Sequence, residues 1–252
     1  MSGHSKWSTI KRKKGKADAE RGKVFTKLIK EITVFAREGG GDKDSNPRLR
    51  SAIQSAKDAN MPVANIDKAI KRGTGELPGV TYESCTFEGY ALGGVAVLVE
   101  SLTDNRNRTT AEVRHAFTKF GGHLGEPHSV SYLFESKGVI IINVDDADEE
   151  KVYEIALENG AEDIRSESGY YEIVSSPDSF ENLREKIAGA ELIYQLAEIS
   201  LHPKTVVSLD LDTARSVIKL VSILEDNDDV QRVSANFDIP DDILLEIEKE
   251  FQ

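Results

Sequence analysis

The sequence contains a single cysteine, Cys85, and no apolar run of about 18 residues that could cross a bilayer. One cysteine excludes an intramolecular disulfide and a zinc site built from several cysteines, so we interpret Cys85 as a small buried side chain. Residues 1–16 are basic, but no apolar segment follows them, which argues against a secretory signal. We therefore expect a cytoplasmic protein that does not insert into membranes.

The motifs of several enzyme classes are also missing. The sequence has no Gly-x-Ser-x-Gly, no phosphate-loop lysine motif and no dinucleotide fingerprint. His115 falls on the polar side of a predicted helix, and His115, His123 and His128 have no cysteine partners, so we predict no metal site. Adjacent carboxylates such as Asp228 and Asp229 are more typical of caps and solvated surface than of catalysis. The sequence predicts a protein that is not an enzyme and uses no cofactor or small-molecule substrate.

Charge is abundant but unevenly distributed. The first 75 residues carry 18 Lys and Arg against 8 Asp and Glu, a net charge of +10 in a chain whose net charge is −12. The remaining 177 residues then carry −22. An amino-terminal part this basic, attached to a body this acidic, indicates a polyanionic partner, and nucleic acid is the leading candidate.

The basic residues are densest at the amino terminus. Cations there can neutralise phosphates, and one aromatic ring can stack on an exposed base. The predicted nucleic-acid-binding residues of this arm are Lys6, Trp7, Lys11, Arg12, Lys13, Lys14 and Lys16. Lysine-rich contacts of this kind give affinity without reading sequence, so the arm does not distinguish DNA from RNA. A solvated tail without a partner is the alternative interpretation.

Apolar periodicity indicates a small helical region next. Residues 18–38 predict a helix with an apolar stripe formed by Phe25, Leu28, Ile29, Ile32 and Phe35. Lys23, Lys27 and Lys30 fall on the opposite side, with Val34 as the one apolar residue among them. We expect a basic helical domain over residues 1–79, whose three lysines extend the nucleic-acid surface.

From Val80 the pattern changes to period two, which is typical of strands. Residues 138–200 predict the order strand, helix, strand, strand, helix, strand of ferredoxin-like domains, with the last strand at 191–200. Further strands are predicted at 81–88, 95–102, 129–135, 205–210 and 229–236, and those after 203 would complete the sheet begun at Thr81. The sequence thus predicts an α+β protein, with the helical domain followed by two α+β, ferredoxin-like domains, the last inserted in the middle one. The expected boundaries are 1–79, 80–135 plus 203–252, and 136–202.

A second candidate contact lies at a predicted strand-to-helix junction. Arg106 and Arg108 stand where free backbone N–H groups favour an anion and where guanidinium groups suit phosphate. A capped helix start with an Asp104-to-arginine pair explains the same residues. Both interpretations remain open, and binding of ribosomal RNA or of a protein carboxylate belongs to the first.

Seven sequence blocks together resemble the YebC family of transcriptional regulators. They are residues 2–7 (SGHSKW), 18–25 (DAERGKVF), 59–62 (ANMP), 103–109 (TDNRNRT), 112–115 (EVRH), 129–132 (SVSY) and 224–231 (LEDNDDVQ). The resemblance covers nearly the whole chain. It implies a three-domain α+β protein without a cofactor that acts as a DNA-binding transcriptional regulator.

The same resemblance implies a second possibility. Mitochondrial relatives of the family are translational activators of cytochrome oxidase, and bacterial members have been linked to ribosomes. We therefore predict a nucleic-acid-binding regulator of gene expression, of the DNA-binding transcriptional type. The alternatives are a ribosome-associated translation factor that binds ribosomal RNA or tRNA, and an acidic adaptor that works through protein contacts alone.

Overall fold

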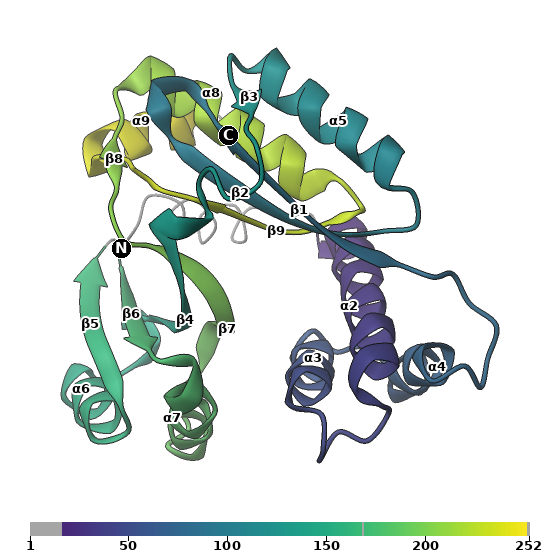
Figure 1. Ribbon diagram of the computed structural model, residues 1–252. Coiled ribbons are helices and arrows are strands. Elements are labelled where there is room, and N and C mark those ends of the chain that lie inside the picture. Colours follow the sequence, from purple (N-terminus) through teal and green to yellow (C-terminus); the bar gives the residue numbers. More distant parts are fainter. Residues whose placement is uncertain (1–16, 168, 251–252) are drawn as a thin grey trace.

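The computed structural model describes residues 17–167 and 169–250, and its first part is a group of three helices (Figure 1). These are α2 (Ala17–Gly39), α3 (Pro47–Asp58) and α4 (Val63–Gly73). The predicted stripe of α2 packs into their common core, where Ile32 is fully buried. Asn46 caps α3 by accepting a hydrogen bond from the Leu49 N–H, and Pro47 opens the helix. The apolar pattern of the sequence therefore determines which side of α2 faces its neighbouring helices.

A four-stranded antiparallel sheet follows, in the order β3-β1-β2-β9. Its elements come from two stretches of the chain: β1 (Glu83–Tyr90), β2 (Ala96–Thr103), α5 (Arg106–Lys119) and β3 (His123–Leu124), then α8 (Leu211–Asp226), β9 (Val230–Ala235) and α9 (Asp241–Glu250). Helices α5 and α8 cover one face of this sheet, where Phe117 and Ile218 are fully buried (Figure 1). We call this unit the middle sheet.

The second four-stranded sheet is formed by the stretch between β3 and α8, and we call it the inserted sheet. Its elements are β4 (Phe134–Asn143), α6 (Glu149–Glu158), β5 (Ala161–Glu167), β6 (Tyr170–Ser175), α7 (Pro177–Gly189) and β7 (Tyr194–Pro203). The strands are antiparallel in the order β5-β6-β4-β7, and α6 and α7 pack on one face. This is the ferredoxin-like arrangement predicted for residues 138–200, and the α+β class is confirmed.

Three predicted strands differ from the structure. Residues 131–133 form a 3-10 turn instead of a strand, because the Glu88 carboxylate accepts hydrogen bonds from three backbone N–H groups between His128 and Ser131. The last strand of the inserted sheet begins at Tyr194, not 191, because Glu191 adopts a left-handed conformation (φ 61°) that closes α7. The strand predicted at 205–210 does not join the middle sheet. It is reduced to β8 (Val207–Ser208), which pairs in parallel with β10 (Phe237–Asp238).

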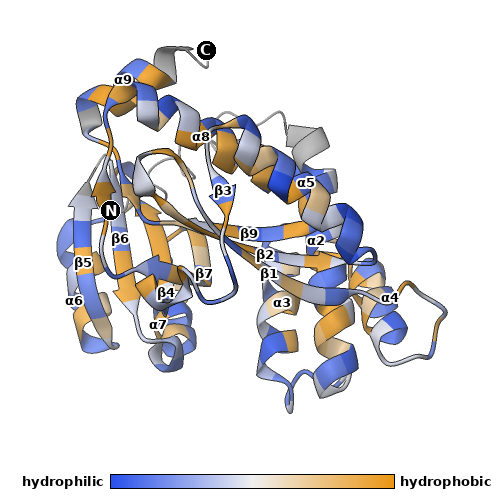
Figure 2. Ribbon diagram, turned by 45° about the horizontal axis from the view of Figure 1, so that its top comes forward, coloured by the Kyte–Doolittle hydropathy of each residue, from blue (hydrophilic) through white to orange (hydrophobic). Residues whose placement is uncertain are grey.

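The buried apolar residues form three main clusters, one in the helical part, one between the middle sheet and its helices, and one between the inserted sheet and its helices. Strands β2 and β4 contain apolar runs, whereas β5 is mostly polar and the helices alternate between apolar and polar residues along their length (Figure 2). A division into domains 1–79, 80–135 plus 203–252, and 136–202 remains our proposal, and the separate cores support it. In the described residues, no helix combines the length and apolar character that a membrane span requires.

Candidate nucleic-acid interface

The three lysines predicted to face nucleic acid follow one side of α2, and that side contacts the middle sheet. Lys30 Nζ lies 2.8 Å from Asp229 Oδ1 and donates to the Asp228 carbonyl at 2.8 Å. Lys27 Nζ donates to the Glu225 carbonyl at 2.7 Å. These acceptors lie at the carboxyl end of α8 and in the turn after it, where the helix dipole adds partial negative charge. The lysine side of α2 is thus attached to the end of α8.

The exposure of the three lysines decreases along the helix. The Lys23 side chain is 46% exposed, and its Nζ lies 3.4 Å from Asp226 Oδ1. Lys27 is half-buried, and Lys30 is 7% exposed. The expectation that all three are open to phosphate is therefore wrong for Lys30, whose ammonium is surrounded by carbonyl and carboxylate oxygens. Lys23 is the member of this set that solvent reaches most freely.

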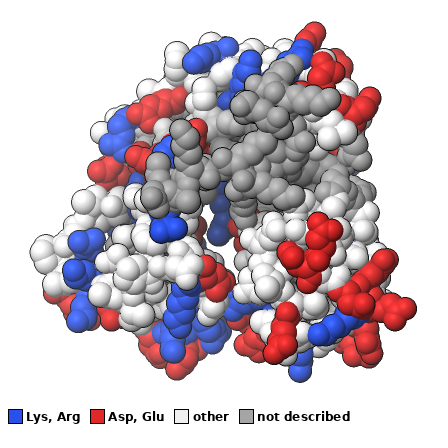
Figure 3. Space-filling view, turned by 180° about the vertical axis from the view of Figure 1, so that it is seen from behind, with Lys and Arg blue, Asp and Glu red and all other residues white. Residues whose placement is uncertain are grey.

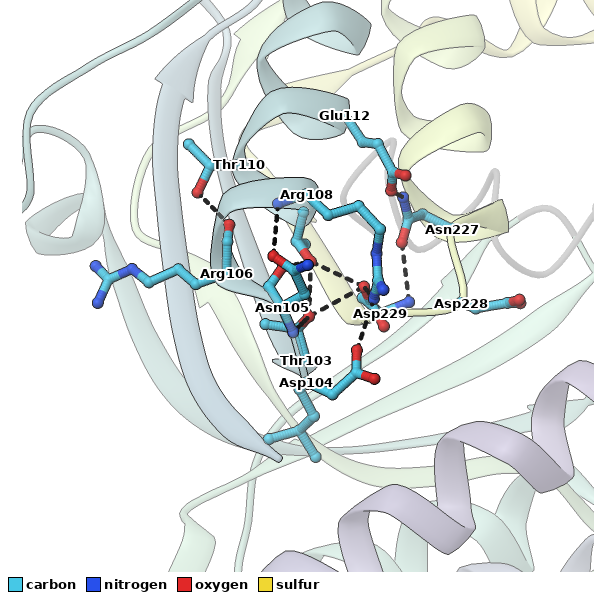
Figure 4. Close-up of polar contacts among 12 residues, drawn as sticks. Thr103, Asp104, Asn105, Arg106, Arg108, Thr110, Glu112, Asn227, Asp228 and Asp229 are labelled. Atoms are coloured by element: carbon cyan, nitrogen blue, oxygen red, sulfur yellow. Dashed lines mark hydrogen bonds and ion pairs between the residues drawn. The ribbon is translucent and has the colours of Figure 1, made fainter. Parts of the chain in front are cut away.

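Asp229 is the centre of a polar cluster between α2, β2 and α5 (Figure 4). Its Oδ2 accepts hydrogen bonds from Arg108, from Thr109 Oγ1 at 2.8 Å and from Thr103 Oγ1 at 3.1 Å. Its backbone N–H donates to Asn227 Oδ1 at 2.9 Å. The carboxylate is thus saturated by two cations and two hydroxyl groups.

The interpretation of Asp229 as solvated surface is wrong, because the residue is only 5% exposed. Burial raises the pKa of its carboxyl group, but hydrogen bonds from Lys30, Arg108 and Thr109 outweigh this effect and hold the pKa well below its ordinary value. Asp229 is therefore ionised at neutral pH. One buried carboxylate facing two cations binds the helical part to the middle sheet.

The two arginines at the junction have different surroundings. The Arg108 guanidinium bridges Asp104, at 2.9 Å, and Asp229. The Asn105 side chain caps α5 by accepting from the Arg108 N–H at 3.1 Å. Arg106 is exposed, forms no ion pair with any residue that the structure describes, and points away from the Asp229 cluster (Figure 4). For Arg108 the structure contains the capped helix start with an Asp-to-Arg pair, whereas Arg106 is available to a ligand.

The remaining predicted site residues are Lys6, Trp7, Lys11, Arg12, Lys13, Lys14 and Lys16, which lie outside the described residues. Further exposed cations of the helical part are Arg48, Arg50, Lys57, Lys68, Lys71 and Arg72. Viewed from behind, Lys and Arg side chains are frequent on the lobe formed by α2, α3 and α4, and acidic side chains gather on the lobe of the inserted sheet (Figure 3). The described part of the chain contains no group of three His, Cys, Asp or Glu residues suited to a metal ion.

One sequence signal indicated that the lysine side of α2 is not open. Val34 stands among the lysines, and it is 1% exposed in the structure. An apolar residue on an otherwise charged helix face marks a contact with a second surface. The acidic partner of that surface, Asp229, carries no such signal, because a buried aspartate and a solvated one look alike in sequence.

Two family models match the chain. The model described as TACO1/YebC protein N-terminal domain matches residues 5–76, and the model described as TACO1/YebC second and third domain matches residues 82–237. The crystal structure of a conserved hypothetical protein from Aquifex aeolicus superimposes with a TM-score of 0.82 at 50% sequence identity. That match covers 91% of this chain and 95% of the Aquifex chain.

Curated relatives are similar over almost their full lengths. A protein of Syntrophus aciditrophicus is 56% identical over 97% of this chain and 98% of its own length. A protein of Geobacter sulfurreducens is 57% identical over 95% of this chain and 96% of its own length. Both are named probable transcriptional regulatory proteins, a regulatory rather than a catalytic description. The resemblance deduced from the seven sequence blocks is thereby confirmed, and the chain belongs to the TACO1/YebC family.

Proposed function

We propose that this protein is a nucleic-acid-binding regulator of gene expression, and specifically a DNA-binding transcriptional regulator. The observation that carries the proposal is the separation of charge, +10 over the first 75 residues against −22 over the rest. The regulatory names of the relatives support it. The proposal assigns no catalytic step, and it includes the expectation of a cytoplasmic protein.

The mechanism begins with the arm of residues 6–16, whose six cations contact phosphates. Lys23, on the exposed start of α2, extends this contact, whereas Lys30 holds α2 against the middle sheet. The acidic inserted sheet is repelled by phosphates and stays away from the nucleic acid. Attraction at one end and repulsion at the other orient the protein on its partner.

A translation factor bound to ribosomal RNA or tRNA is the second candidate. The observation that favours it is Trp7, which stands among the arm cations and offers a ring for stacking. Unpaired bases are accessible for such stacking in RNA loops but not in a DNA duplex. The same arm would then bind a different nucleic acid.

Cross-linking in living cells, followed by sequencing of both bound DNA and bound RNA, tests the proposal. We expect enrichment of promoter DNA with the intact chain and its loss with Lys13→Gln combined with Lys14→Gln. A matched control combines Lys186→Gln with Lys219→Gln, two exposed lysines of the acidic body, and should leave the enrichment unchanged. Enrichment of ribosomal RNA or tRNA would replace the transcriptional proposal with the translational one, and recovery of neither would contradict both.

A further inference from the structure

A cleft of about 640 Å³ opens between the helical part, the middle sheet and the inserted sheet. One wall is the start of α2, where Val24 and Leu28 stand among the charged residues Lys23, Lys27 and Glu31. The other two walls are the strands β7 and β9. The space-filling view from behind shows a hollow between the two lower lobes (Figure 3).

The cleft is lined by the edges of two sheets. Among the described strands, β7 pairs only with β4 and β9 pairs only with β2, so each is the last strand of its sheet. Residues 194–198, 200–203 and 231–235 line the cleft as nearly continuous runs. If only one face of a strand lined the cleft, only every second residue of that strand would be among the lining residues. The strand edges, with their unpaired backbone groups, therefore face the cleft.

The strand register identifies the backbone groups that are free. The Lys204 N–H donates to the Leu133 carbonyl at 2.9 Å, next to the pairing of Phe134 with Pro203. In an antiparallel pair of strands, the backbone N–H and C=O groups of every second residue bond to the partner strand. Those of the residues between them point away from it. The N–H and C=O groups of Ala197, Ile199 and Leu201 consequently point away from β4. Where β7 does not run beside β9, an extended chain would find these groups in the spacing of a new strand.

The side chains around this edge are polar and incompletely paired. Ser200 and His202 of β7 and Gln231 of β9 line the cleft. His202 Nε2 and both amide atoms of Gln231 are buried and have no hydrogen-bond partner among the residues that the structure describes. Buried polar groups without partners are rare in proteins, and a bound polypeptide supplies both donors and acceptors.

The charge of the lining selects among possible occupants. The acidic residues are Glu31, Asp58, Glu198, Glu225 and Asp226, whereas the basic residues are Lys23, Lys27 and Arg232. The excess of carboxylates disfavours a phosphate backbone and favours cations. Burial raises the pKa of Glu31, and Glu198 and Glu100 raise it further, whereas Arg232 and Lys27 lower it.

We propose that this cleft binds an extended, basic segment of a partner protein, which adds as a strand to the free edge of β7. The backbone hydrogen bonds of the new strand give affinity, and the carboxylates of the cleft select cationic side chains. The site shares Lys23 with the proposed nucleic-acid surface, but its selectivity for cations rests on the carboxylates of its lining. It adds a protein partner to the proposed regulator.

The test uses the full chain and three probes: an alternating Lys-Val decapeptide, a Glu-Val decapeptide and a single-stranded DNA of the same length. Amide hydrogen exchange locates binding, and fluorescence anisotropy measures affinity. We expect the Lys-Val peptide to slow the exchange of the Ala197, Ile199 and Leu201 amides, and the other two probes to leave it unchanged.

Two variants make the test specific. Ala197→Pro removes an outward N–H without removing a bond to β4 and should lower affinity by about 10-fold or more. Glu198→Gln should lower it about 3-fold, as expected for one partly exposed charge, whereas Glu158→Gln on the exposed side of α6 should not change it. Melting temperatures near that of the parent chain verify that both variants are folded.

Several results would overturn the proposal. These are equal binding of the Glu-Val peptide, protection of amides elsewhere, protection of the β7 amides by single-stranded DNA, or no binding of the Lys-Val peptide at all. If Ala197→Pro fails to fold, Glu198→Gln against Glu158→Gln still decides the matter. Because the arm variant Lys13→Gln with Lys14→Gln should bind the peptide normally, failure here is distinguishable from failure of the nucleic-acid proposal.

Discussion

Lys30 Nζ lies 2.8 Å from Asp229 Oδ1, and the two side chains are only 9% and 7% exposed, although 199 residues separate them in the chain. The pair joins α2 to the turn between α8 and β9. Arg108 approaches the other carboxylate oxygen from α5. These contacts determine how the helical part sits on the middle sheet, and so where the attached arm begins.

We expect removal of either member of this pair to destabilise the protein. Asp229→Ala leaves Lys30 buried without its carboxylate and deprives Arg108 of a partner, so the free energy of unfolding should fall by about 3–5 kcal/mol. Urea denaturation of the parent and the variant measures this loss. Lys23→Ala, which removes a half-exposed ion pair, should cost less than about 1 kcal/mol. Equal losses of unfolding free energy for Asp229→Ala and Lys23→Ala would contradict the conclusion that the buried Lys30–Asp229 pair stabilises the fold.

The pair also predicts a loss of stability in acid. Because the pKa of Asp229 is held below its ordinary value of about 3.9, its ionised form is favoured by folding. The stabilisation is complete above that ordinary value and is lost as the pH falls through the folded-state pKa. Unfolding free energy measured from neutral pH downwards should therefore decline more steeply below pH ~4 in the parent than in Asp229→Asn.

Other carboxylates contribute to the same profile, so the difference between parent and variant is the informative quantity. Hydrogen bonds to the backbone N–H groups of Val130, His128 and Ser131 outweigh burial and lower the pKa of Glu88, which adds a loss of the same sign. Burial raises the pKa of Glu31, which acts in the opposite direction. Identical slopes for parent and Asp229→Asn would show that Asp229 is not paired in solution.

Glu88 should be required for the ordered loop before β4. Its carboxylate accepts from the N–H groups of His128, Val130 and Ser131 at 2.7–2.8 Å. Glu88→Gln loses the negative charge and one acceptor, so we expect a cost of about 1–3 kcal/mol and faster hydrogen exchange of these three amides. Glu83→Gln, at the exposed start of β1, serves as the control and should change neither.

Substitutions of Arg106 and Arg108 should differ in their effects on stability and on nucleic-acid binding. Arg108→Gln removes two ion pairs and should lower the unfolding free energy, because the buried Asp229 carboxylate loses one of its two cationic partners. Arg106→Gln should change it by less than about 0.5 kcal/mol, because Arg106 is exposed and forms no ion pair with the described residues. If the exposed Arg106 contacts phosphate, Arg106→Gln weakens nucleic-acid binding without loss of stability. Unchanged binding would remove Arg106 from the interface.

Local patterns of the sequence predicted much of the fold. The apolar stripe of α2 identified its buried side, and the element order of residues 138–200 identified the ferredoxin-like sheet. Both depend on periodicity over neighbouring residues, which reflects local geometry. The shortened β8 and the turn at residues 131–133 were not predictable, because Glu88 and Asn236 act on segments distant in the chain.

Contacts between distant segments also limited what the sequence could predict of the candidate nucleic-acid interface. Lys23, Lys27 and Lys30 have the same spacing whether they face phosphate or an acidic turn, so periodicity could not separate the two. Val34 on the same face was the one local indication of a contact. The pairing of Lys30 with Asp229 could not be predicted, because the two residues are 199 positions apart and come together only in the folded chain.

The salt dependence of binding to duplex DNA tests the nucleic-acid assignment most directly. Each phosphate contact contributes about 0.9 to the slope of log K against log salt concentration, so Lys13→Gln with Lys14→Gln should reduce the slope by about 1–2. The control with Lys186→Gln and Lys219→Gln should reproduce the slope of the parent. A slope unaffected by the arm substitutions, or equally affected by the control, would contradict the account.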